Sequence, residues 1–255
     1  MFMIDMHLDP ARLMRFTHMQ GHPLGSDGDF GYAAHAWLAA ALGNQAPQPF
    51  RLFERRDGLH LLGYADHDAA ALCDQARTFA EPVAAEVCRW DSLAGKAMPE
   101  TWAKGRRLGF EIRACPVSRK ERERDVYLSA LDRAKSNGAI PPSRDQVYLD
   151  WLVQRMRAAT VSGGDFIDTR GDVHEPVVEF PRGALSISGF RRVKVLRRRA
   201  SRGRSDKLGI ERPDVIFTGE LIIREPKEFN DLLKRGVGRH RAFGFGMLLL
   251  RPAGR

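Results

Sequence analysis

The dipeptide Asp57-Gly58 constrains the fold more than any other feature of the sequence. It separates two strand-like segments, Pro49–Arg56 and Leu59–Ala65. A two-residue connection of this type favours the type I′ turn that closes a tight β-hairpin. The chain is therefore expected to contain an antiparallel sheet in its first hundred residues, and the segments around the hairpin decide which fold that sheet belongs to.

Each side of this hairpin carries one helical and one strand-like segment. The helix before it is rich in alanine and leucine, with Asp29 as a candidate N-cap and Gly43 as its stop. Asp66 is a candidate N-cap for the helix that follows the hairpin. The order strand-helix-strand-strand-helix-strand is the ferredoxin-like arrangement. Its remaining segments are strands at residues 2–8 and Val83–Trp90, and helices at Tyr32–Leu42 and from Asp66 to about Ala80.

The same order recurs, with an extra helix and insertions, in the second half of the chain. We therefore predict an α+β protein of two tandem ferredoxin-like (RRM-like) domains, at residues 1–92 and 106–255, joined by a linker at 93–105. The segments of the second domain are strands at Arg106–Val117, Pro213–Arg224 and Phe245–Arg251, helices at Arg122–Ala134, Arg144–Ala159 and Pro226–Lys234, and a strand-and-loop region from Val161 to Arg199.

Composition excludes several classes of protein. With 43% hydrophobic residues among 255, the chain can build a hydrophobic core, which excludes a wholly disordered protein. Its longest apolar runs are of strand length, which is too short to span a bilayer, and its first residues lack the pattern of a signal peptide. Cys73, Cys88 and Cys115 form no disulfide or zinc pattern, which predicts a protein of a reducing cytoplasm. The histidines show no metal-ligand spacing along the chain either, so no metal or cofactor is expected.

Positive charge is concentrated near the C-terminus. Residues 1–180 carry 22 basic and 25 acidic side chains, whereas residues 181–255 carry 19 basic and 7 acidic ones. Such an excess indicates a surface for a polyanion, and guanidinium groups match phosphate geometry. A solvated loop is the alternative interpretation. Eight basic residues without an intervening acid form what we call the arginine run: Arg191, Arg192, Lys194, Arg197, Arg198, Arg199, Arg202 and Arg204.

A glycine-rich segment at 236–246, here called the glycine loop, is the sharpest motif. Its glycines surround a basic and aromatic centre, after a helix and before an apolar strand. This order excludes a P-loop and a dinucleotide fingerprint, where glycines follow a strand and open a helix. Glycine lets the backbone approach a phosphate closely, and the arginines would neutralise its charge. A plain helix-to-strand turn is the alternative. The candidate phosphate-binding residues of the loop are Gly236, Gly238, Arg239, His240, Arg241, Gly244 and Gly246.

This C-terminal pattern, Gly-x-Gly, five residues and Gly-x-Gly, resembles that of the CRISPR repeat endoribonucleases. The ending Ala-Phe-Gly-Phe-Gly-Met-Leu-Leu-Leu-Arg-Pro is most similar to the CasE type, the crRNA-processing subunit of the type I-E Cascade complex. The resemblance covers the first strand, the Tyr32–His35 helix and the chain from about Pro213 onward. Residues 120–180 carry no motif of the family.

The resemblance implies that Tyr32 and His35 are catalytic, since CasE proteins place a Tyr-x-x-His in this helix. Three residues apart, the two side chains share one helix face, while Trp37, Leu38, Ala41 and Leu42 would face the core. The implied reaction is metal-independent attack of a ribose 2′-hydroxyl on its own phosphate, which gives a 2′,3′-cyclic phosphate and a 5′-hydroxyl. Which residue is acid and which is base stays open.

One departure from the family concerns the cation that would stabilise the transition state. Family members can carry further basic residues after the histidine, but the next basic residue here is Arg51. Arg239 and Arg241 are alternative sources of that charge, and His240 is an alternative catalyst. The implied partners are CRISPR repeat RNA, crRNA and other Cascade subunits, with no membrane and a monomer when isolated.

Two other functions remain open. A non-catalytic subunit that caps the crRNA hairpin would need the glycine loop and the arginine run but not Tyr32 and His35. A general RRM-like chaperone would need an aromatic-rich strand motif, which the sequence lacks. Phe190, beside the arginine run, is expected to pack against the protein rather than stack on a base.

Overall fold

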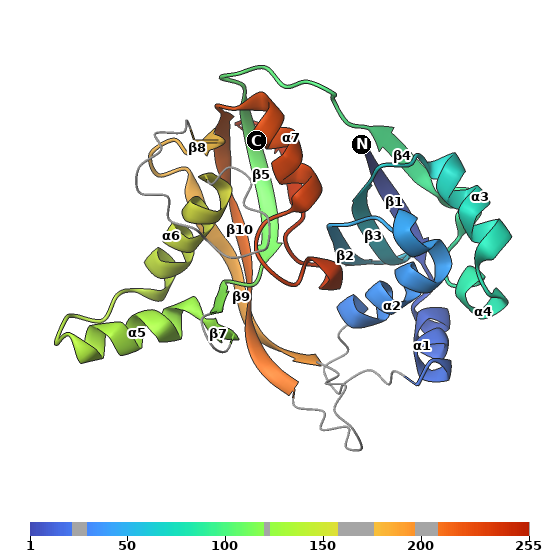
Figure 1. The fold of residues 1–255 in the computed structure, drawn as a ribbon, viewed down its shortest axis with the longest axis horizontal. Helices are drawn as coiled ribbons and strands as arrows, with labels where there is room; N and C mark the ends of the chain where they lie inside the picture. The colour runs from blue at the N-terminus through green and yellow to red at the C-terminus, as the bar shows by residue number, and fades with distance from the viewer. Residues whose placement is uncertain (22–29, 120–122, 158–175, 197–208, 255) are drawn as a thin grey trace. The chain divides into compact units, whose positions relative to one another are not determined.

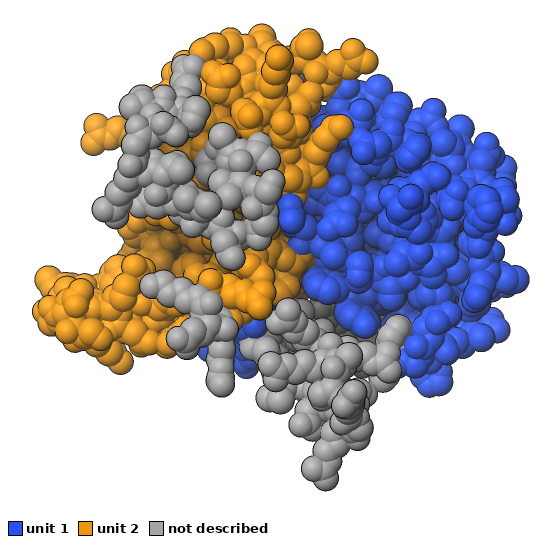
Figure 2. All heavy atoms as spheres, viewed as in Figure 1, with its two compact units in different colours: residues 1–98, 192–212, 241–244 blue, residues 99–191, 213–240, 245–255 orange. Residues whose placement is uncertain are grey.

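The computed structural model describes residues 1–21, 30–119, 123–157, 176–196 and 209–254. They form two compact units (Figure 2). One comprises residues 1–98, 192–212 and 241–244, and the other residues 99–191, 213–240 and 245–255. Part of the glycine loop thus belongs to the first unit although its two ends belong to the second.

The first unit has a four-stranded antiparallel sheet in the order β2-β3-β1-β4 (Figure 1). This is the strand order of a ferredoxin-like domain, and the predicted Asp57-Gly58 hairpin joins β2 to β3. The elements are β1 (Phe2–Leu8), α1 (Pro10–Met19), α2 (Phe30–Leu42), η1 (Gly43–Gln45), β2 (Phe50–Arg55), β3 (Gly58–Ala65), α3 (Ala69–Phe79), α4 (Pro82–Ala85), η2 (Trp90–Ser92) and β4 (Ala94–Ala97).

The prediction of a strand at Val83–Trp90 is wrong. Pro82 begins the short helix α4, which ends at Ala85, and within the segment only Cys88 pairs with β1, through an isolated antiparallel bridge to Leu8. The fourth strand of the sheet is β4 instead. The sequence pattern also missed α1, although Asp9 caps it by accepting hydrogen bonds from the amides of Ala11 and Arg12.

Two predicted caps of the first unit have different outcomes. Asp68, not Asp66, caps α3, because its carboxylate accepts the amide hydrogen bond of Ala71 at 2.9 Å. Asp29, the expected cap of α2, lies outside the described residues. Gly43 follows the last residue of α2, as predicted.

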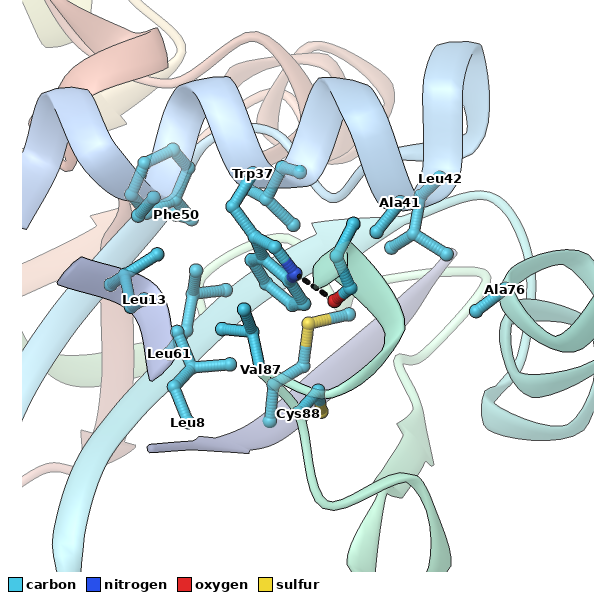
Figure 3. Close-up of a cluster of buried hydrophobic side chains, with 14 of the residues drawn as sticks. Leu8, Leu13, Trp37, Ala41, Leu42, Phe50, Leu61, Ala76, Val87 and Cys88 are labelled. Carbon is cyan, nitrogen blue, oxygen red and sulfur yellow. Dashed lines mark hydrogen bonds between the residues drawn. The ribbon is translucent and has the colours of Figure 1, made fainter. Parts of the chain in front are cut away.

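The core of the first unit lies between this sheet and its helices (Figure 3). Trp37, Leu38, Ala41 and Leu42 of α2 are all buried, as their spacing predicted. The Trp37 indole nitrogen donates a 2.9 Å hydrogen bond to the Ala84 carbonyl oxygen, which ties α2 to α4. Burial of these side chains fixes the rotation of α2 about its axis and so decides which residues remain on its accessible face.

The second unit repeats the fold around a sheet in the order β11-β5-β10-β8, with β9 paired to β10. Several predicted segments differ in their bounds: the helix expected from Arg122 begins at Val126, the helix from Arg144 is described to Arg157, and the last strand begins at Leu248. The strand expected from Pro213 begins at Gly209, and the strand expected from Arg106 to Val117 ends at Ala114. The elements are β5 (Arg107–Ala114), β6 (Val117–Arg119), β7 (Glu123–Asp125), α5 (Val126–Ser136), α6 (Arg144–Arg157), β8 (Val178–Glu179), β9 (Leu185–Leu196), β10 (Gly209–Ile223), α7 (Pro226–Arg235) and β11 (Leu248–Pro252). The short helix η3 (Arg241–Phe243), between α7 and β11 in the sequence, belongs to the first unit.

Two general expectations can be compared with this structure. All three cysteines are free thiols, and two of them, Cys88 and Cys115, are buried. Among the described residues, no helix is long and apolar enough to cross a membrane.

Candidate functional site

Tyr32 and His35 lie one turn apart near the start of α2, and both side chains are half-buried. The buried stripe of α2 faces the core, so these two residues occupy its flank. The short helix η3, which contacts α2, brings the Phe243 ring to both of them. Two predicted residues and one segment of the glycine loop are therefore neighbours within the first unit.

The Phe243 ring organises this group. Its centroid lies 6.0 Å from that of Tyr32 in a stacked arrangement, and 5.2 Å from that of His35 in an edge-on arrangement. Aromatic pairs at such distances attract each other and restrict one another's orientation. Sequence reasoning did not single out Phe243, although it belongs to the aromatic centre of the glycine loop.

Burial lowers the pKa of His35 below the ordinary histidine value. The cause is loss of hydration, which penalises the charged imidazolium more than the neutral ring. At neutral pH His35 is therefore a neutral imidazole, which has one nitrogen that can accept a proton.

The glycine loop is closed at its base by two backbone hydrogen bonds. The Val237 amide donates to the Gly246 carbonyl oxygen at 2.9 Å, and the Gly246 amide donates to the Arg113 carbonyl oxygen at 2.7 Å. Gly238 has φ +80°, and a Cβ there would lie 2.9 Å from the Trp151 ring. The loop thus has a defined path, in which Gly236, Gly244 and Gly246 also adopt positive φ.

Arg239 and His240 lie in the second unit and share a buried partner, Glu123. The His240 ring nitrogen Nε2 is 2.7 Å from Glu123 Oε1, and Arg239 Nε is 3.3 Å from Oε2. His240 adopts φ +62°, which is uncommon for a residue with a side chain. These contacts give both residues a structural role, while Arg241, the third basic residue of the loop, begins η3 beside Phe243.

Only the first part of the arginine run lies in the described residues. Arg191 Nε is 2.6 Å from Asp214 Oδ2, and Asp214 also binds the guanidinium of Arg113. Burial of Asp214 opposes its ionisation, but the two arginines outweigh this and lower the pKa of that carboxyl. Arg192 Nη1 lies 3.6 Å from Glu211 Oε2.

The remaining basic residues of the run lie further along β9 and beyond it. The backbone of Lys194 lies in β9. Residues Arg197, Arg198, Arg199, Arg202 and Arg204 lie outside the described residues. Sequence reasoning also missed the acidic partners Glu123, Asp214 and Glu211, because pairing across strands cannot be deduced from local charge.

Phe190, beside the run, contacts neighbouring side chains but is itself exposed, so the expectation that it packs against the protein is confirmed only in part. Its ring centroid lies 6.0 Å from that of Tyr148, and the Arg144 guanidinium lies 4.9 Å from the ring centre. The side chain is 41% exposed, so one part of the ring remains at the surface.

Comparisons with known proteins identify one matching family and a group of solved structures that share one fold. The model of a family described as CRISPR associated protein matches residues 1–252. A comparison with curated protein sequences finds no match.

Several solved structures share the fold over nearly the whole chain. CRISPR endoribonuclease Cse3 bound to a 19-nucleotide RNA is 19% identical, with a TM-score of 0.62, and the match covers 99% of this chain and 100% of that one. Thermus thermophilus Cse3, bound to an RNA representing a pre-cleavage complex, is 18% identical with a TM-score of 0.57 and 98% coverage of both chains. Cas6e from Escherichia coli K-12 is 18% identical with a TM-score of 0.51, covering 99% of this chain and 100% of its own. At these identities the likeness establishes the two-domain ferredoxin-like fold.

Proposed function

The chain belongs to the CRISPR-associated protein family, and from this premise we propose that it is the endoribonuclease that cuts CRISPR precursor RNA at each repeat. It binds the stem-loop of the repeat, cleaves beside it without a metal ion, and keeps the product as a subunit of a type I-E Cascade complex. The observation that carries this proposal is the grouping of Tyr32, His35 and Phe243 on α2 and η3.

In the proposed reaction, His35 is the general base. Its neutral imidazole takes the proton of the ribose 2′-hydroxyl, and the oxygen then attacks the adjacent phosphorus. The P–O5′ bond breaks and the leaving O5′ takes a proton from water, which leaves a 2′,3′-cyclic phosphate on one product and a 5′-hydroxyl on the other. His35 then returns its own proton to solvent. The nucleophile belongs to the substrate, so positioning supplies much of the acceleration.

Tyr32 and Arg241 have supporting roles in this proposal. The Tyr32 hydroxyl donates a hydrogen bond to a non-bridging phosphate oxygen, and the Arg241 guanidinium stabilises the charge that develops there. Arg241 is favoured over Arg239 because it lies in η3, whose Phe243 ring contacts Tyr32 and His35, whereas Arg239 belongs to the second unit.

The RNA stem is recognised mainly through its phosphates. A-form RNA has a narrow major groove that side chains cannot read, so shape and backbone contacts dominate. The arginine run supplies the positive charge for these contacts, and the glycine loop supplies close backbone approach near the cleaved bond.

The test is cleavage of a CRISPR repeat RNA from the host in the presence of EDTA. We expect one cut with a cyclic phosphate end, and no cut in the same RNA with a single 2′-deoxynucleotide at the cleaved position. The deoxy substrate should bind as tightly as the natural one. If the folded protein binds both RNAs and cleaves neither, the chain is instead a non-catalytic subunit that caps the crRNA hairpin.

A further inference from the structure

Two histidines and an aspartate from separate parts of the chain meet in the first unit. His7 lies on β1, His60 on β3, and Asp57 in the turn of the β2–β3 hairpin. One ligand atom from each of the three, two imidazole nitrogens and a carboxylate oxygen, lie within 4.8 Å of one another. The spacing of these residues in the sequence gives no sign of this cluster, because antiparallel pairing of β1 with β3 brings them together.

The strands place this cluster on the sheet face opposite the core. Ile4, Met6 and Leu8 of β1 are buried in the core with Trp37 of α2. Side chains alternate along a strand, so Asp5 and His7 point to the other face. His7 is paired with His60 across the two strands, and their rings stack with centroids 4.4 Å apart.

The distances are close to those that a tetrahedral metal requires. Zinc bonds of about 2.0–2.2 Å place neighbouring ligand atoms roughly 3.4 Å apart. His60 Nε2 lies 3.2 Å from Asp57 Oδ2, and His7 Nε2 lies 3.9 Å from the same oxygen. The Asp57 side chain is 59% exposed, so water has access to the fourth ligand position.

A second carboxylate orients His60 in the way that metal-binding histidines are commonly oriented. His60 Nδ1 lies 3.2 Å from Asp5 Oδ1, on the side of the ring away from Asp57. When the neutral His60 ring carries its hydrogen on Nδ1 and donates a hydrogen bond from it to Asp5, the lone pair of Nε2 points toward Asp57. Carboxylate, imidazole and metal form such a series in many protein sites.

From this geometry we propose that His7, Asp57 and His60 bind one Zn²⁺ ion, with Asp5 as the orienting group. His7 Nε2 donates a 2.8 Å hydrogen bond to the Asp57 carbonyl oxygen, so metal binding breaks this hydrogen bond and the neutral ring then carries its proton on Nδ1. The ion fastens the β2–β3 hairpin to β1. It is separate from Tyr32 and His35, because α2 packs on the other face of the sheet, and the proposed cleavage needs no ion.

The test is Zn²⁺ binding to the tag-free full chain after treatment with EDTA and removal of the chelator. Isothermal titration calorimetry should show one Zn²⁺ per chain, and Zn²⁺ should raise the melting temperature. Asp57→Asn removes the ligand but keeps a favourable turn, because Asn-Gly is also a type I′ sequence. This variant and His7→Gln should lose binding, and Asp5→Asn should weaken it about 10- to 100-fold.

His18→Gln is the matched control, because His18 is an exposed histidine on α1 outside the cluster. It should bind Zn²⁺ as the unchanged chain does, and circular dichroism without metal verifies that each variant is folded. The proposal is overturned if the folded chain binds no Zn²⁺, in which case the cluster is a hydrogen-bonded link between strands. It is also overturned if Asp57→Asn and His7→Gln bind as tightly as His18→Gln. No RNA is present, so neither result depends on the proposed nuclease.

Discussion

His35 combines partial burial with a position one turn from Tyr32, and its lowered pKa follows from that burial. A general base of this kind stays deprotonated to lower pH than a histidine of ordinary pKa, which is already half protonated at about pH 6.5. The chemistry at this residue is therefore visible in how the cleavage rate changes with pH.

We predict that the single-turnover cleavage rate is constant above neutral pH and falls to half of this value only at a pH below about 6.5, the half-point expected of an ordinary histidine. The sign follows from the lowered pKa: the neutral base persists above the folded-state pKa and is lost as pH falls through it. Rates measured at saturating protein between pH 5 and 8 test this. A rate that declines as pH rises through 6 to 7 would instead make His35 the acid.

Phe243 supplies the second residue-scale prediction. Phe243→Leu keeps an apolar side chain but removes the ring that contacts both Tyr32 and His35. We expect the cleavage rate to fall by about tenfold or more, because misplaced catalytic groups are costly, while RNA affinity is unchanged. Leu93→Ile, a similar aliphatic change within the first unit at a partly buried position, is the control. Equal rates for Phe243→Leu and the control would remove Phe243 from the site.

At the scale of elements, the glycine loop is held by a close contact with α6. Gly238→Ala places a methyl group 2.9 Å from Trp151 at a positive φ. We predict a loss of about 1–3 kcal/mol in the free energy of unfolding, measured with urea. Gly138→Ala is the matched control, because Gly138 also has positive φ but nothing lies within 4 Å of the methyl group that alanine would add there. If the two variants are equally stable, the Trp151 contact contributes nothing.

The sequence predicted well those elements that carry a local signal, such as a turn dipeptide or a helical pattern of apolar residues. Asp57-Gly58 marked the hairpin, and the alanine-rich pattern around Trp37 marked α2 and its buried face. Val83–Trp90 failed because a short apolar segment fits both a strand and a helical turn, and Pro82 decided for the helix.

The candidate site was predictable only in part, for a related reason. Tyr32 and His35 share one helix, so their spacing reveals their proximity. Phe243, Glu123 and the His7–His60 pair depend on contacts between distant segments. Such contacts are decided by strand pairing and packing, which no local pattern encodes.

At the scale of the whole molecule, charge is unevenly distributed, with 19 basic and 7 acidic residues in 181–255. Part of this charge is neutralised within the protein, since Arg191 pairs with buried Asp214. We therefore expect the arginines after Lys194 to supply more of the RNA affinity than Arg191 does.

We predict that replacing Arg197 and Arg198 by alanine weakens RNA binding and makes it less dependent on salt. Each lost phosphate contact should reduce the slope of log affinity against log salt by about 0.7–0.9. Replacing Lys96 and Lys135, two exposed lysines in the balanced part of the chain, removes the same charge and is the control. Binding assays from low to high salt distinguish the two pairs. If the two double variants showed the same slope of log affinity against log salt, the arginine run would be excluded as the RNA-binding segment.

The central claim, that the α2 residues cut RNA, is tested most directly by His35→Ala in a single-turnover assay with repeat RNA and EDTA. We predict that RNA binding is retained while the cleavage rate falls by about 10²- to 10⁴-fold, the usual contribution of a general base. His18→Gln should cleave as the unchanged chain does. Cleavage by folded His35→Ala at the unchanged rate would contradict the claim and place the active site elsewhere in the molecule.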